Sequence, residues 1–129
     1  MINRENNPEF LNSFLDYSIT ILNKSPNSVK EYNYDLSMFL KYMKIHFKLT
    51  KENDFNNISI KDFDLETLKK ITLEDIHSFV SYLAVTNRSK AATRARKISS
   101  IRIFFKYMTV KAKILDVNPA QNLETPKQD

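Results

Sequence analysis

The sequence predicts an all-α protein, a bundle of four to five helices in one domain. Glycine is absent from all 129 residues, although tight hairpins and phosphate-binding loops favour residues that tolerate a positive φ. Several long segments carry apolar residues at every third or fourth position, as an amphipathic helix does. Asn or Ser followed by proline, which is typical of a helix start, occurs at three places. With 42% hydrophobic residues, the chain can bury a core of its own.

The first two helices are expected at two of these cap–proline pairs. Asn7 and Pro8 predict a helix that continues to about residue 23 with a broad apolar face. Ser25 and Pro26 predict a second helix over residues 25–47. The face of this second helix opposite its apolar stripe carries side chains that can bond phosphates or bases, namely Asn27, Lys30 and Tyr34. A solvated surface face is an equally good interpretation of these three residues alone.

Residues 48–71 have a different composition and predict a loop insertion anchored by a few apolar side chains. A short helix is expected from Asp64 through Lys70, and a short strand at Ile58–Ile60 is an open alternative for part of the loop. The many acids in the loop indicate that it points away from a polyanion. They are Glu52, Asp54, Asp62, Asp64 and Glu66.

Thr72 and Asp75 resemble a capping box, and they predict a third major helix that ends near Thr86. Closer to the end of the chain, Asn118 and Pro119 predict a short terminal helix. Residues 124–129 are polar and are interpreted as the start of a linker to an absent domain, so that the domain itself spans residues 1–127.

The fourth major helix is the most basic part of the chain. The stretch 88–113 holds nine Lys and Arg residues and no acid, whereas the rest of the chain holds 11 basic and 15 acidic residues, a net charge of −4. Such a concentrated positive field is typical of a protein that binds a polyanion. Ser89 is the expected N-cap, and the helix is expected over about Lys90–Lys111.

Apolar side chains form one stripe along this helix, which leaves cations and short hydroxyls on the opposite side and the flanks. The side chains expected to neutralise phosphates are Lys90, Arg94, Lys97 and Lys106. Those expected nearer to base edges are Arg96, Ser100 and, on the second helix, Tyr34. A merely solvated basic face is the alternative, but a surface helix usually pairs its cations with acids at i±4, and none is present here.

The sequence shows no active site. Cysteine is absent, the two histidines lie in no metal-binding pattern, and no glycine motif is present, so we expect no catalytic residue, metal or cofactor. No apolar segment is long enough for a signal peptide or a membrane span, which makes a cytoplasmic protein the expectation.

Three segments in order resemble the tyrosine recombinases, the Xer and phage-integrase family. Residues 25–42 are similar to S-x-x-T/S-x-x-x-Y-x-x-D-L-x-x-F, with Ser28 at the second marked position. Residues 93–107 are similar to T-x-x-R-x-L-S-x-x-R-x-F-F-x-Y, which begins at Thr93. Residues 118–127, NPAQNLETPK, are similar to the family's exit into its next domain.

The resemblance implies the N-terminal, SAM-like core-binding domain of a site-specific recombinase, which clamps double-stranded DNA for integration or recombination. It implies that the second and fourth helices approach the major groove, which adds Ser28 and Thr93 to the DNA-binding residues above. The catalytic residues would belong to a C-terminal domain beyond Lys127, so this fragment should cut nothing. The isolated domain is expected to be a monomer and its parent a homo- or hetero-tetramer on DNA.

Two other functions remain open on the sequence. One is a stand-alone helical DNA-binding regulator, which would need no further domain. The other is a helical protein–protein interaction module whose basic helix meets an acidic partner. Salt-dependent binding to duplex DNA would separate a DNA partner from a protein partner.

Overall fold

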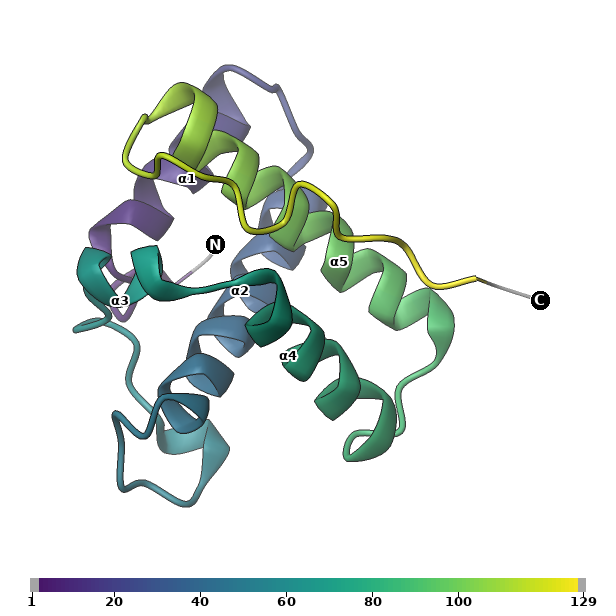
Figure 1. Cartoon of the computed structure of the whole chain (residues 1–129). Helices are drawn as coiled ribbons and strands as arrows, with labels where there is room; N and C mark the ends of the chain where they lie inside the picture. The colour runs from purple at the N-terminus through teal and green to yellow at the C-terminus, as the bar shows by residue number, and fades with distance from the viewer. Residues whose placement is uncertain (1–2, 128–129) are drawn as a thin grey trace. The chain divides into compact units, whose positions relative to one another are not determined.

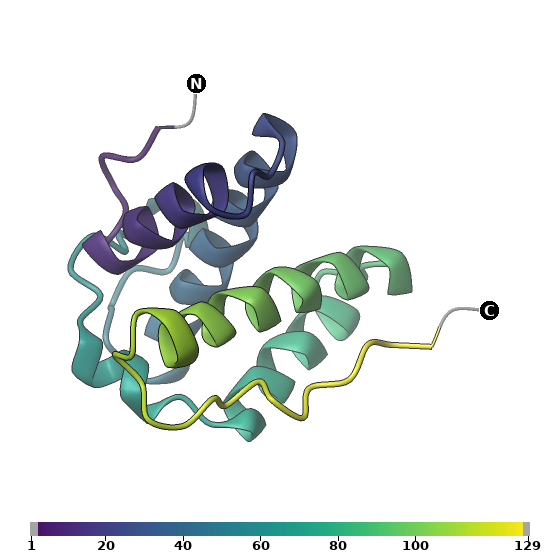
Figure 2. The ribbon, with the colours of Figure 1, turned by 90° about the horizontal axis from the view of Figure 1, so that it is seen from above.

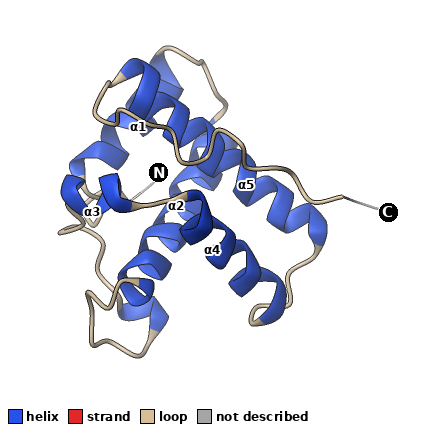
Figure 3. Ribbon diagram, in the orientation of Figure 1, coloured by secondary structure: helices blue, strands red, loops and turns tan. Residues whose placement is uncertain are grey.

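The computed structural model describes residues 3–127, and over this range the chain is helical with no strand (Figure 3). The predicted all-α class is therefore confirmed. In chain order (Figure 1), the elements are α1 (Glu9–Thr20), α2 (Pro26–His46), the 3-10 turn η1 (Phe55–Asn57), α3 (Leu65–Lys70), α4 (Leu73–Val85), α5 (Ala91–Lys106) and the π-helical turn η2 (Tyr107–Lys111). None of the described helices is long and apolar enough to cross a membrane.

The backbone groups into two compact units that divide between Leu68 and Lys69. In the first unit α1 packs on α2, and the loop after α2 returns to this pair. Phe10 of α1 meets Phe63 of the loop edge-on, with ring centroids 6.2 Å apart. The fully buried side chains of this core include Leu11, Phe14, Leu15, Leu36, Phe39, Leu40 and Met43.

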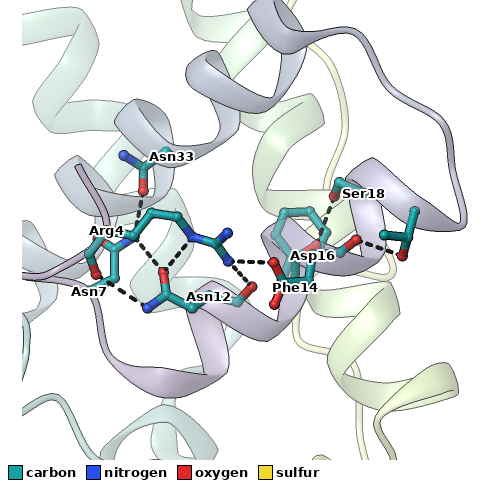
Figure 4. Close-up of polar contacts among 8 residues, drawn as sticks. Arg4, Asn7, Asn12, Phe14, Asp16, Ser18 and Asn33 are labelled. Atoms are coloured by element: carbon teal, nitrogen blue, oxygen red, sulfur yellow. Dashed lines mark hydrogen bonds and ion pairs between the residues drawn. The ribbon is translucent and has the colours of Figure 1, made fainter. Parts of the chain in front are cut away.

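The start of α1 differs from the prediction, because Asn7 does not cap the helix. Pro8 is the residue at the N-cap, and no side chain caps the first turn. The Asn7 amide is buried and donates instead to the side-chain oxygens of Asn12, at 3.0 Å, and Asn33 of α2, at 2.7 Å (Figure 4). Arg4 donates to the Asn12 carbonyl and the Asp16 carboxylate. Asn7 therefore joins α1 to α2, a tertiary role that replaces the local cap.

Two other predicted helix starts are confirmed. The Ser25 hydroxyl accepts from the backbone N–H of Ser28 at 3.1 Å, with Pro26 in the first helical position of α2. Thr72 and Asp75 form both bonds of a capping box at the start of α4. These starts could be predicted because a cap depends on residues only three positions apart.

Residues 48–71 are mostly loop with apolar anchors, as predicted, and they contain no strand. Ile58, Ile60 and Phe63 are buried. Asp64 caps the short helix α3, since its carboxylate accepts from the N–H of Thr67 at 2.7 Å.

Within residues 3–127, four residues adopt a left-handed backbone, and each lies just beyond the end of a helix. Asn23 follows α1, Lys48 follows α2, Arg88 follows α4 and Lys113 follows η2, with φ between 51° and 58°. This conformation lets the next amide bond back to the last turn, as Leu49 N does to Lys44 O at 2.8 Å. Glycine usually fills such positions, and in a chain without glycine these residues carry the steric cost.

The second unit contains α4, α5 and η2, and the predicted helix over Lys90–Lys111 is confirmed with a π-helical last turn. Ser89 is not its cap, because the Ser89 hydroxyl donates to the carbonyl of Leu83 at 2.8 Å and closes the end of α4. The N-cap position falls to Lys90, which has no side-chain capping bond.

The short helix predicted after Asn118 and Pro119 is not formed. The Asn118 side chain accepts from Ala120 N at 2.9 Å, and only turns follow. The Leu123 amide bonds to the carbonyl three residues earlier, so no ladder of i−4 bonds is established. The segment instead runs irregularly beside α5 (Figure 2).

Candidate nucleic-acid interface

The buried face of α5 is wider than the predicted stripe. Both Phe104 and Phe105 are buried, which broadens the inward-facing arc and brings Lys97 and Ser100 into it. Lys97 is 4% exposed and Ser100 is 1% exposed, so their predicted place on accessible faces is wrong. The Ser100 hydroxyl bonds back to the carbonyl of Arg96 at 3.4 Å.

The exposed face of α5 carries its own line of cations. Ala92, Arg96, Ser99, Arg102 and Lys106 are exposed and recur in steps of three and four. The exposed position predicted for Arg96 is therefore confirmed. Arg102 and Lys106 lie one helical turn apart on a flank of this surface and are exposed as well. Arg102 was not among the DNA-contact residues predicted from the sequence, although it is exposed about 120° around the helix from Arg96.

The first turn of α5 is favourable for an anion. It contains no acid, and no side chain caps it. The first N–H groups of a helix lack intrahelical partners and lie at the positive end of the helix dipole. Lys90 is exposed at this end, whereas Thr93 and Arg94 are half-buried. The guanidinium of Arg94 donates to the carbonyl of Ser89. This bond keeps the positive charge of Arg94 next to the first turn of α5.

The exposed face of α2 has the residues that the sequence predicted. These residues, Asn27, Lys30 and Tyr34, are all exposed. Tyr34 is 62% exposed, so its ring can stack on a ligand and its hydroxyl can bond to one. Ser28 is half-buried, and its hydroxyl accepts from the Ser25 hydroxyl at 3.1 Å. Its backbone N–H is also used by the helix cap.

The two units differ in net charge. The first unit has 8 Lys and Arg and 10 Asp and Glu, whereas the second has 12 and 5, so their net charges are −2 and +7. The excess of positive charge therefore lies in the second unit. In the described part of the chain, no three acids, histidines or cysteines group together as metal ligands.

Comparison with known proteins bears out the predicted resemblance. The sequence model of the family described as "Phage integrase, N-terminal SAM-like domain" matches residues 10–112. A protein named tyrosine recombinase XerC, from Caldanaerobacter subterraneus, is 36% identical over 121 residues, covering 93% of this chain and 34% of that protein. Tyrosine recombinase XerD from Oceanobacillus iheyensis is 32% identical over 105 residues, covering 81% of this chain and 29% of that protein.

The chain spans about a third of the length of these curated relatives. Tyrosine recombinase XerD from Listeria monocytogenes shows the same proportion, with 30% identity over 93% of this chain and 34% of that protein. No solved structure significantly matches the chain.

Proposed function

This chain belongs to the family of phage integrase N-terminal SAM-like domains, and on that premise we propose that residues 1–127 bind duplex DNA as the N-terminal domain of a site-specific recombinase. The relatives are named tyrosine recombinases, and this chain corresponds to about a third of each. The domain holds the DNA in the cytoplasm, and the rest of the parent protein breaks and rejoins the strands. By itself the domain leaves DNA strands intact.

The observation that carries the proposal is the start of α5. An uncapped, acid-free first turn lies beside the exposed Lys90, and the exposed Arg96 follows less than two turns later. Backbone N–H groups at a helix start and neighbouring cations together bind phosphates. A merely solvated basic face would gain nothing from leaving the first turn uncapped.

The proposed contacts are of three kinds. Lys30, Lys90 and Arg94 neutralise phosphates, whereas Arg96 and Tyr34 lie nearer to base edges. Asn27, Ser28 and Thr93 contribute polar contacts at the starts of the two helices.

Two residues predicted to contact DNA, Lys97 and Ser100, are too buried to do so. Lys106 lies ten residues beyond Arg96, about 15 Å along the helix, and contributes at most a distant phosphate contact.

Fluorescence anisotropy with labelled duplexes at several salt concentrations tests the proposal. If four to six phosphates are neutralised, log K falls against log salt with a slope of about −4 to −5. The Lys90→Ala variant makes the slope shallower by about one unit. Lys111→Ala is the matched control, because Lys111 is exposed but lies at the far end of the basic segment.

A second arm tests base readout with duplexes enriched from a random pool by binding to this chain. Arg96→Ala costs on the order of 1–3 kcal/mol on the enriched duplex and less on a scrambled one. Equal losses on both duplexes would reject base readout by Arg96. Absence of salt-dependent duplex binding would reject the DNA-binding function and favour a protein partner.

A further inference from the structure

The second unit contains a groove away from the start of α5. A hollow of about 800 Å³ lies between one side of α5 with η2 and the segment 116–121, where Figure 2 shows the chain running beside the helix. Its walls carry apolar and polar side chains, the two cations Arg102 and Lys106, and one acid, Asp116. The ones that matter below are Arg102, Ile103, Lys106, Val110, Val117 and Ala120.

The groove combines exposed apolar surface with cations. Val110 is 50% exposed and Val117 is 76% exposed although both line a hollow. Arg102 and Lys106 lie one helical turn apart and are exposed, and neither forms an ion pair or side-chain hydrogen bond within the described chain. A DNA phosphate would satisfy the cations but leave the two valines in water. An apolar side chain flanked by carboxylates would satisfy both.

The chain itself contains one segment of this kind. Large apolar residues exposed in the described structure are Ile19, Ile21, Tyr34, Ile45, Leu49, Leu65, Val85, Val110 and Val117. Of these, Leu65 alone has an acid on each side, Asp64 and Glu66. All three residues are exposed, at the start of α3 in the first unit.

We propose that the groove of one copy binds Asp64, Leu65 and Glu66 of a second copy. Leu65 packs on Val110 and Val117, while the two carboxylates face Arg102 and Lys106. The net charges of the two units, −2 and +7, favour the same pairing. Because groove and segment are different surfaces, the contact is head-to-tail and can extend to more than two copies.

This association is weak and salt-dependent. A contact centred on one leucine buries far less than the ~1,000 Å² typical of a stable interface, so a dissociation constant on the order of 100 µM is expected at low salt. Ion pairs at an exposed rim are screened as ionic strength rises. The chain is therefore a monomer at micromolar concentration.

Sedimentation velocity without DNA, from 10 µM to 1 mM chain in 50 mM and 500 mM NaCl, tests the proposal. The first variant, Arg102→Glu with Lys106→Glu, reverses the groove. The second, Asp64→Asn with Glu66→Lys, reverses the segment and keeps a capping residue at position 64. Each variant alone should associate at least ten-fold more weakly than the natural chain. An equimolar mixture of the two should associate again, because the unchanged groove of one meets the unchanged segment of the other.

Three results would overturn the proposal. They are a natural chain that stays monomeric at 1 mM in low salt, association that survives either charge reversal, and a mixture that fails to associate although both variants melt like the natural chain. Leu65→Ser, which leaves all charges in place, should also weaken association ten-fold, and its failure to do so would reject the apolar contact. The measurement contains no DNA, so its failure leaves the proposed DNA binding untouched.

Discussion

The Lys44 ammonium and the Asp62 carboxylate form an ion pair with 2.6 Å between Nζ and Oδ1. Lys44 is on α2, and its side chain is only 9% exposed, whereas that of Asp62 is 75% exposed. The same ammonium donates to the carbonyl of Ser59 at 2.9 Å. A buried cation is costly unless it is partnered, so these bonds tie the acid-rich loop to the end of α2.

Asp62→Asn should lower the free energy of unfolding by about 0.5–1 kcal/mol at pH 7, a modest value because the carboxylate is exposed to solvent. The hydrogen bond from Lys44 lowers the pKa of Asp62 in the folded protein. The stabilisation is therefore fully present above about pH 4, the ordinary range of an unfolded Asp, and is lost as the pH falls through the lowered pKa.

Urea unfolding between pH 2 and pH 7 measures this difference. The two curves of stability against pH should converge at the acid end. Glu124→Gln is the control, since Glu124 is exposed and forms no ion pair within the described chain. A constant difference between Asp62→Asn and the natural chain across this range would contradict the assignment.

Replacing a left-handed residue by glycine should stabilise the protein. Lys48→Gly and Lys113→Gly each remove a steric cost at φ near 55°, and a gain of about 0.5–1 kcal/mol is expected. Asn23→Gly should gain less, because Asn tolerates this conformation better than Lys does. Lys61→Gly is the control, and the added flexibility of its unfolded chain should make it neutral or destabilising. Thermal melting ranks the four variants, and a loss of stability in both Lys48→Gly and Lys113→Gly would refute the argument.

Arg96→Ala and Lys97→Ala should separate binding from stability. Arg96 is exposed, so its removal should weaken DNA binding while the melting temperature stays nearly constant. Lys97 is buried, and its removal leaves polar surroundings unsatisfied, so a loss of about 2 kcal/mol of stability is expected. Melting curves and anisotropy on both variants make the comparison. A fully stable Lys97→Ala variant that binds DNA poorly would restore the direct contact predicted from the sequence.

The capping box of α4 should be sensitive to the hydroxyl of Thr72. Thr72→Ala removes the acceptor for the N–H of Asp75 and should cost about 1 kcal/mol. Thr72→Ser keeps that acceptor and should cost much less. Equal losses in the two variants, measured by urea unfolding, would show that the methyl group rather than the cap matters.

Local signals decided which predictions succeeded. The starts of α2 and α4 and the cap at Asp64 each depend on neighbours within three residues, and all three are confirmed. The exposed face of α2 with Asn27, Lys30 and Tyr34 also follows from the 3.6-residue period. The predictions for Asn7 and Ser89 were wrong because each side chain bonds to a more distant partner, in α2 and in α4 respectively.

The sequence by itself determined the helical class, the order and approximate extent of the long helices, the family and the concentration of charge in one segment, because each is a property of composition or of residues within a few positions. Only the tertiary structure decided that Lys97 and Ser100 are buried, and that the terminal segment runs beside α5 as an irregular chain. The direction in which a helix turns its buried face depends on the neighbours that it packs against. A second buried phenylalanine, Phe104, was enough to change which cations of α5 meet the solvent.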